Sequence, residues 1–439
     1  MVNTKYLMVI LFCAGLLSGC GENETKSNRI PAASSSYIVV AWNDLGMHCL
    51  NPSYDTAVIL PPYNTVWAQV IKRANPPQVV TAGLTVSYSI LNNTTSQKGL
   101  FTQFWTNALK LFGKAPAQDK GLNLVNSAIS NGLTGTMVVN GDHFQVNGIP
   151  VVPINDNGVK NPYQIAEITV KDASGTIVAQ TQATVPTSDE INCGKCHASS
   201  TVNATVTDVF NDVLAKHDSS HGTVLLSQKP VLCASCHGSP ALGTSGSGTS
   251  GKYLSQAIHG FHSRLAASQQ PSCYDCHPGA STKCNRSISH TNAEGNCTTC
   301  HGTLANVAAT ITANPPRIPW ETEPKCASSS CHSSTISQVD TGTTLYRNAI
   351  GHGGIYCAGC HGSPHAMVPS NIASDNYQAL QYQAKALPLG DCRNCHDGKR
   401  GGGNNFSREH NGRTSACNVC HTGFSDAGNT TKWPHQFQW

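Results

Sequence analysis

TIVAQTQATVPTSDEINCGKCH, residues 176 to 197, is the stretch at which the character of this 439-residue chain changes. Its first half, TIVAQTQATV, is a β-branched run of the kind that forms strands. Its second half ends in CGKCH, in which two cysteines separated by two residues are followed directly by a histidine. Runs like the first recur before this junction, and copies of the second recur after it. The chain is therefore expected to fold in two regions with different physical bases.

The region before the junction, residues 37 to 187, is expected to form a β-rich domain. Short β-branched runs separated by Asn, Gly and Pro are typical of an antiparallel sandwich or barrel. The runs are YIVVAW, VWAQVIKR, LTVSYSIL, TMVVNG, IAEITVKD and TIVAQTQATV. KDASGT, between the last two, predicts a hairpin turn. Only FTQFWTNALKLFG, residues 101 to 113, is predicted to be helical.

The pattern Cys-x-x-Cys-His occurs seven times after the junction. Covalent c-type haem needs two thiols for the vinyl groups on one edge of the porphyrin and a following histidine for the iron. Zinc knuckles also use Cys-x-x-Cys pairs, but they place four ligands around each metal and need no histidine at this point. Seven copies therefore predict haem. They are Cys193, Cys196, His197; Cys233, Cys236, His237; Cys273, Cys276, His277; Cys297, Cys300, His301; Cys357, Cys360, His361; Cys392, Cys395, His396; and Cys417, Cys420, His421.

CASSSCH, residues 326 to 332, is a stretched copy of the same pattern. Cys326, Cys331 and His332 keep the thiols and the histidine, and the inserted serines are small enough to loop out. We expect an eighth haem here; a disulfide or free thiol pair beside a surface histidine is the alternative. Little strand or long-helix periodicity separates the motifs. Residues 188 to 439 are therefore predicted to be a mostly irregular domain with short helices around eight haem c groups.

The second axial ligand decides whether each haem carries electrons or reacts. After the first 36 residues only Met47, Met137 and Met367 remain, so methionine cannot serve eight irons. Histidine can, and bis-histidine ligation closes the iron to substrate and keeps its potential low. One member of each close pair in the haem region is expected to be spare. The candidate distal ligands are His217, His221, His259, His262, His290, His352, His365, His410 and His435.

The two other histidines, His48 and His143, belong to the β-rich region. His48, between Met47 and Cys49, is interpreted either as a haem ligand or as part of a structural turn.

The amino terminus has the features of an export signal. Lys5 precedes an apolar run from Tyr6 to Leu17 that is short for a membrane span, and LSGC follows. This resembles a bacterial lipobox, which implies a signal peptide over residues 1 to 19 and an acylated Cys20. Residues 20 to 36 are interpreted as a flexible tether. Gly21 after the cysteine, instead of aspartate, favours the outer membrane in such lipoproteins. An ordinary signal peptide with an incidental cysteine is the alternative.

Cysteine and charge counts add two expectations. Of 20 cysteines, the haem motifs, Cys13 in the signal and Cys20 account for all but Cys49 and Cys284. Two remaining cysteines in an oxidising compartment indicate one disulfide. The formal charge of +4 omits two propionates per haem. The loaded protein should thus be net acidic, which argues against nucleic acid as a partner.

Three segments extend the likeness beyond the haem motifs. They are NDLGMHCLN with ILPPYNTVWAQV after it, KNPYQIAEITVKDASG leading into PTSDEINCGKCH, and CYDCHPGASTKCNRSISH. Together they resemble outer-surface multihaem c-type cytochromes of bacteria that respire metals and other extracellular acceptors, in which a β-rich amino-terminal module is fused to cytochrome segments. The stretched CASSSCH departs from that pattern.

The resemblance implies an electron-transfer protein with no catalytic residue. Electrons would pass through eight bis-histidine haems to extracellular or outer-surface acceptors. The implied partners are other cytochromes or outer-membrane conduit proteins and those acceptors, with self-assembly into a filament as one form. The implied location is the outer membrane or cell surface, through the lipid anchor.

Two alternatives stay open. A multihaem reductase of nitrite, hydroxylamine or a sulfur oxyanion needs one open iron with acid or base groups nearby, for which CASSSCH is the obvious candidate. No lysine replaces a proximal histidine, and there are enough histidines to close every iron. In the third hypothesis the β-rich domain binds a partner or a mineral, and the haems are secondary.

Overall fold

The computed structural model describes residues 35–74, 76–278, 281–290, 297–313, 317–325 and 344–397. Strands β1 to β11 lie between Tyr37 and Ser188, which confirms a β-rich domain in the first region. The first sheet has the order β1 (Tyr37–Trp42), β4 (Asn64–Lys72), β9 (His143–Ile149) and β8 (Val138–Asn140), with β5 (Gln78–Val79) paired to β4. The second has the order β2 (His48–Cys49), β11 (Ile177–Ser188), β10 (Tyr163–Asp172), β6 (Leu84–Ile90) and β7 (Thr134–Thr136).

The two sheets curl around one hydrophobic core. Alternate residues of β10 are buried, as a half-exposed strand requires, and they meet alternate residues of the strands opposite. The core contains Val39 and Ala41 from β1, Val66 and Val70 from β4, and Ala166, Ile168 and Val170 from β10. Residues from both sheets therefore share a single interior.

The local predictions for turns and helix in this domain are confirmed. β10 and β11 form an antiparallel hairpin, and the carboxylate of Asp172 accepts hydrogen bonds from the backbone N–H groups of Ser174 and Thr176 in the turn. The helical stretch forms η1 (Gly99–Thr102) and α1 (Gln103–Phe112), which ends at Gly113 with φ +68°.

Two short parallel pairings were not predicted. β2 runs parallel to β11, with His48 opposite Thr187, and β3 (Ala57–Val58) runs parallel to β12 (Val231–Leu232). β2, β3 and β12 are each two residues long, so they leave no periodic signal in the sequence. They depend on residues far away in the chain.

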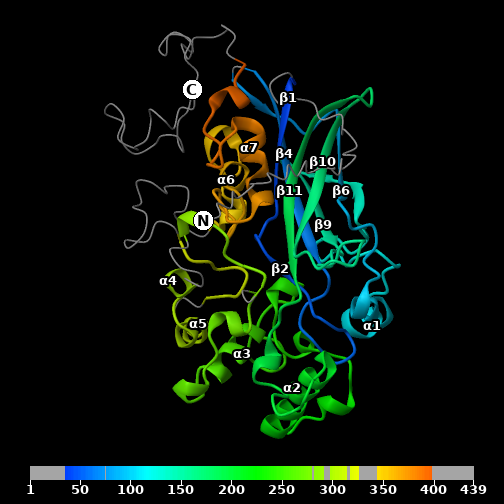
Figure 1. Cartoon of the computed structure of the whole chain (residues 1–439), viewed down its shortest axis with the longest axis vertical. Helices are drawn as coiled ribbons and strands as arrows, with labels where there is room; N and C mark the ends of the chain where they lie inside the picture. Colours follow the sequence, from blue (N-terminus) through cyan, green and yellow to red (C-terminus); the bar gives the residue numbers. More distant parts are fainter. Residues whose placement is uncertain are drawn as a thin grey trace, which may run out of the picture.

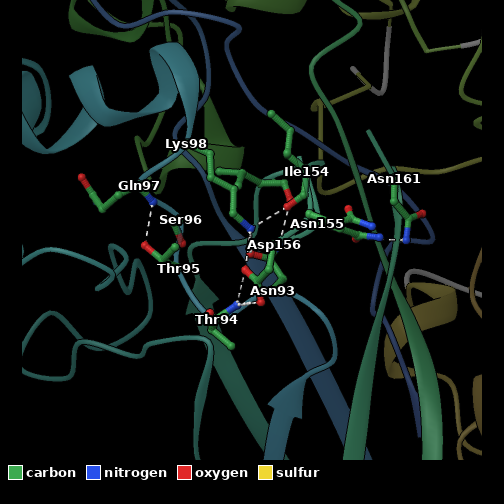
Figure 2. A network of polar contacts seen from close by, with 12 residues as sticks. Asn93, Thr94, Thr95, Ser96, Gln97, Lys98, Ile154, Asn155, Asp156 and Asn161 are labelled. Atoms are coloured by element: carbon green, nitrogen blue, oxygen red, sulfur yellow. Dashed lines mark hydrogen bonds and ion pairs between the residues drawn. The ribbon is translucent and has the colours of Figure 1, made fainter. Parts of the chain in front are cut away.

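Lys98 joins two loops at one end of the β-rich domain, as Figure 2 shows. Its ammonium group donates to Asn93 Oδ1 at 2.8 Å and to the Ile154 carbonyl at 2.8 Å, and it forms an ion pair with Asp156 at 3.0 Å. The loop after β6 is thereby fixed to the loop after β9.

The region after Ser188 consists of short helices and irregular chain. The α-helices are α2 (Val206–His221), α3 (Leu254–His262), α4 (Cys297–His301), α5 (Leu304–Thr310), α6 (Cys357–His361) and α7 (Tyr377–Gln383). The 3-10 turns are η2 (Cys193–Lys195), η3 (Leu225–Ser227), η4 (Cys233–Ser235), η5 (Pro240–Leu242), η6 (Ala267–Gln269), η7 (Cys273–Asp275), η8 (Ile288–His290), η10 (Tyr346–Asn348), η11 (His352–Gly354), η12 (Ala373–Asn376) and η13 (Cys392–Asn394). No helix among the described residues is long and apolar enough to cross a bilayer.

α2 is longer than the sequence indicated. Thr205 and Asp208 form a reciprocal capping box at its start, and Gly222 ends it in the left-handed conformation with φ +67°. These end signals, more than an apolar stripe, define the helix.

The helices of the second region are distributed along the length of the sheets (Figure 1). α2, α3 and α5 lie near one end of the strands, while α6 and α7 lie alongside β1 and β11. The outward face of β1 packs against the α6 and α7 region through Ile38, Val40 and Trp42, which meet Tyr356 and Tyr382. The β-rich domain therefore carries the second region along its side.

Candidate haem sites and their histidine pairs

Six of the Cys-x-x-Cys-His motifs lie among the described residues, and each forms one turn of helix. These turns are η2, η4, η7, α4, α6 and η13. In the first, the backbone N–H of His197 donates to the carbonyl of Cys193 at 2.9 Å, and the same bond recurs from His277 to Cys273 at 2.9 Å. Residues three and four apart on such a turn lie side by side. The turn therefore presents both thiols and the histidine together, as attachment to one porphyrin edge requires.

The remaining predicted site residues lie outside the described residues. They are Cys20, Cys326, Cys331, His332, His410, Cys417, Cys420, His421 and His435.

Five motif histidines each face a second histidine from elsewhere in the chain. The ring centroids are 6.5 Å apart for His197 and His262, 6.4 Å for His237 and His217, 6.0 Å for His277 and His259, 6.0 Å for His301 and His365, and 6.3 Å for His396 and His352. Every pair joins one predicted proximal histidine to one predicted distal candidate.

This spacing is the one that a single iron needs between two imidazoles. A ring nitrogen binds a first-row metal at about 2 Å and lies about 1.1 Å from the ring centre, so two opposed imidazoles have centroids about 6.2 Å apart. Among the described residues no group of three or more His, Cys, Asp and Glu side chains could hold a bare metal ion. A haem iron needs only two protein ligands, because the porphyrin supplies the others. The residues present therefore fit haem.

The hydrogen bonds of these histidines involve Nδ1, which leaves Nε2 available to bind a metal. Nδ1 of His259 donates to the Ser255 carbonyl at 2.6 Å, and Nδ1 of His262 donates to the Ile258 carbonyl at 2.8 Å. A carbonyl can only accept, so Nδ1 carries the proton and Nε2 keeps the lone pair that a metal requires. Nδ1 of His237 likewise lies 3.2 Å from the Lys252 carbonyl.

Burial also keeps the histidines neutral. It lowers the pKa of His277 and of His396 to about 4, with nearby histidines adding to the effect. Burial lowers the pKa values of His259, His301 and His365 as well. Neutral imidazole is the form that binds a metal.

In the pair His259 and His262 the structure distinguishes no spare member. Both face a motif histidine, because residues three apart share one face of α3 and two motifs lie against that face. In the other pair His217 faces His237, and the ring of His221 lies 4.9 Å from that of His217.

Two further histidines end short helical turns. His290 ends η8, with its Nδ1 3.2 Å from the hydroxyl of Ser287, and the motif histidine His361 ends α6.

His48 and His143 make contacts within the β-rich domain. Nε2 of the buried His48 lies 3.2 Å from Asp44, and His143 stacks on Trp67 with 4.5 Å between ring centroids. These contacts favour the interpretation of His48 as part of a structural turn over that of a haem ligand.

Cys49 and Cys284 are brought near each other without a bridge between them. Burial, and next the charge of Cys284, raises the pKa of the Cys49 thiol to about 12. Cys284 Sγ also lies 4.0 Å from Nδ1 of His365. The disulfide stays a prediction.

Asp212 contacts a motif histidine, and sequence reasoning missed it. It lies on α2, and its carboxylate accepts a hydrogen bond from Nδ1 of His197 at 2.9 Å and from the backbone N–H of Ala198 at 3.2 Å. Nothing in the sequence pairs two residues fifteen positions apart. A carboxylate in this position raises the basicity of a metal-bound imidazole.

We expect Asp212→Asn to raise the reduction potential of the haem at Cys193 and Cys196. An amide withdraws less proton density from the imidazole than a carboxylate, so ferric iron loses stability relative to ferrous. A tenfold change in that balance corresponds to about 60 mV. Spectroelectrochemical titration checks this, with Asp208→Asn on the same helix as the control. Equal titration curves for the two variants and the parent protein would contradict the role of Asp212.

No protein-family model, curated protein or solved structure matches the chain. The case for the site therefore rests on the motifs and on the geometry of the histidine pairs.

Proposed function

We propose that this chain is a multihaem c-type cytochrome that carries electrons through eight bis-histidine haems to acceptors at or beyond the outer surface of a bacterium. The observation that carries the proposal is the set of five histidine pairs, each spaced at 6.0–6.5 Å and each containing one motif histidine. The predicted lipid anchor at Cys20 would hold the protein to the outer membrane.

Haem supplies one-electron chemistry, and the protein supplies attachment, orientation and tuning. Cys273 and Cys276 on η7 would hold one porphyrin edge, and His277 and His259, which face each other, would bind the iron. With both positions filled by imidazole, no substrate reaches the iron. Such a site is suited to electron transfer and unsuited to a reaction at the metal.

Buried surroundings and backbone acceptors support the same role. The predicted distal histidines on α3 are oriented by hydrogen bonds to carbonyl groups of their own helix. A rigid ligand set keeps the reorganisation of the site small when an electron arrives. The implied donors and partners are other cytochromes or outer-membrane conduit proteins.

Protein-film voltammetry tests this function against the reductase alternative. We expect a broad reversible wave from many low-potential haems and no catalytic current when nitrite, hydroxylamine or sulfite is added. The reduced protein should also be reoxidised by insoluble ferric oxide. A catalytic wave with any of the soluble substrates would reject the conduit and favour an open iron.

A further inference from the structure

We infer that the described attachment motifs form one row whose order differs from their order in the chain. The row runs through motifs 233–237, 193–197, 273–277, 297–301, 357–361 and 392–396. This inference rests on the proposed function, since it treats the histidine pairs as the ligands of successive haems. Each neighbour relation in the row comes from a separate set of contacts.

α2 connects the first two members. His217 on this helix faces His237, while Asp212, five residues earlier, accepts the hydrogen bond from His197. α2 also packs against η2, the turn that contains the 193–197 motif.

α3 connects the second member to the third. His262 faces His197 and His259 faces His277, so one helix face serves both motifs. The two motifs also touch directly, because Lys195 within the one forms a salt bridge with Asp275 within the other.

The third and fourth members meet through two packed helices. α3, whose His259 faces His277 of the third member, packs against α5 beside the fourth. α5 directly follows the fourth motif and packs on α3, where a Cβ added at Gly260 would lie 3.9 Å from the Cβ of Ala308.

The segment from His352 to His365 continues the row. His365 faces His301 of the fourth motif, His361 belongs to the fifth member, and His352 faces His396 of the sixth. Three axial ligands in one short segment place its motif between its two neighbours. The backbone N–H of Leu389 also donates to the Cys360 carbonyl at 3.0 Å.

The β-rich domain contacts the row at both ends, which gives this domain a structural role. β3 pairs with β12, immediately before the first member, and Ala74 after β4 bridges to His396, with its N–H 3.3 Å from the Cys395 carbonyl. The row therefore follows the length of the sheets, from the α2 end to the α6 and α7 side (Figure 1). Electrons would enter and leave at positions set by this order.

Pulsed electron paramagnetic resonance tests the order. Bis-histidine ferrous haems are diamagnetic, so in fully reduced protein only irons with a vacated position would bind nitric oxide and become spin probes. His217→Ala would be combined in turn with His262→Ala, His259→Ala, His365→Ala and His352→Ala, with nitric oxide added in stoichiometric amount to the vacated irons.

We expect the dipolar coupling between the two probes to weaken in that order of variants. Any other ranking of the dipolar couplings would overturn the proposed order of the motifs, even if the parent protein carries every haem and binds no nitric oxide. Nitric oxide bound by the reduced parent protein would instead contradict the bis-histidine sites, and with them the proposed function. For double variants that do not fold, iron positions from electron cryomicroscopy of the loaded parent protein decide the same order.

Discussion

Arg286→Ala is expected to destabilise the protein by about 3–5 kcal/mol, the usual cost of breaking a buried ion pair from one side. The Arg286 side chain is 1% exposed and that of Asp375 is 3% exposed, with Nε and Oδ2 2.8 Å apart. Nη1 of Arg286 also donates to the Gly46 carbonyl at 2.7 Å. Alanine would leave a buried carboxylate without its cation. Chemical denaturation of the loaded protein, followed by circular dichroism, measures the change.

The loss of Arg286 should also affect the proposed haem site of His301 and His365. The backbone N–H of Arg286 donates to the His365 carbonyl at 2.6 Å, and His365, with φ +63°, faces His301. Arg286 and its ion-pair partner Asp375 therefore hold the turn around Gly46 in the β-rich domain close to His365, a predicted distal ligand. Weakening this ion pair should broaden the spectrum of that haem as well as lower stability.

A surface ion pair supplies the control for this prediction. Arg393 pairs with Asp391, and the arginine side chain is 53% exposed while that of Asp391 is 10% exposed, so water can replace the lost cation and Arg393→Ala should cost clearly less than Arg286→Ala. Arg286→Met combined with Asp375→Leu should recover much of the loss, because neither charge then remains buried. Similar costs for Arg286→Ala and Arg393→Ala would contradict the assignment.

His259→Ala is expected to open one haem and no other. The variant removes the imidazole that faces His277 and leaves the Cys273 and Cys276 attachments in place. Its ferrous form should bind carbon monoxide in stoichiometric amount, while the parent protein should bind none, since both axial positions are filled. Absorbance titration of the Soret band gives the stoichiometry.

Gln256→Ala, three residues earlier on the same helix, is the matched control. It tests whether a change in α3 alone loosens the site, and it should bind no carbon monoxide. Carbon monoxide binding by both variants, or by neither, would mean that His259 does not close this iron.

Sequence patterns predicted the parts of the fold that depend on neighbouring residues. The alternation in IAEITVKD and TIVAQTQATV, the DASG turn and the capped helix around Trp105 all use local preferences, and each is present. β2, β3 and β12 escaped prediction because two residues hold no period. Their pairings are set by distant residues.

The candidate site divides in the same way. The motif spacing predicted the proximal ligands, and the remaining histidines of the second region supplied the distal candidates, but neither pattern said which histidine would face which motif. His352 lies five residues before Cys357, yet it faces His396 and not the motif that follows it. The partner of each motif is decided by how α2, α3 and the segment before α6 pack, which is a property of the whole fold.

Electron paramagnetic resonance of the fully oxidised parent protein, quantified against haem content, tests the central claim most directly. The eight motifs predict eight haems. If each iron has two imidazole ligands, the spectrum contains only low-spin ferric signals. A stoichiometric high-spin signal would show that an iron is open, and the account of the chain as a closed electron carrier would fail.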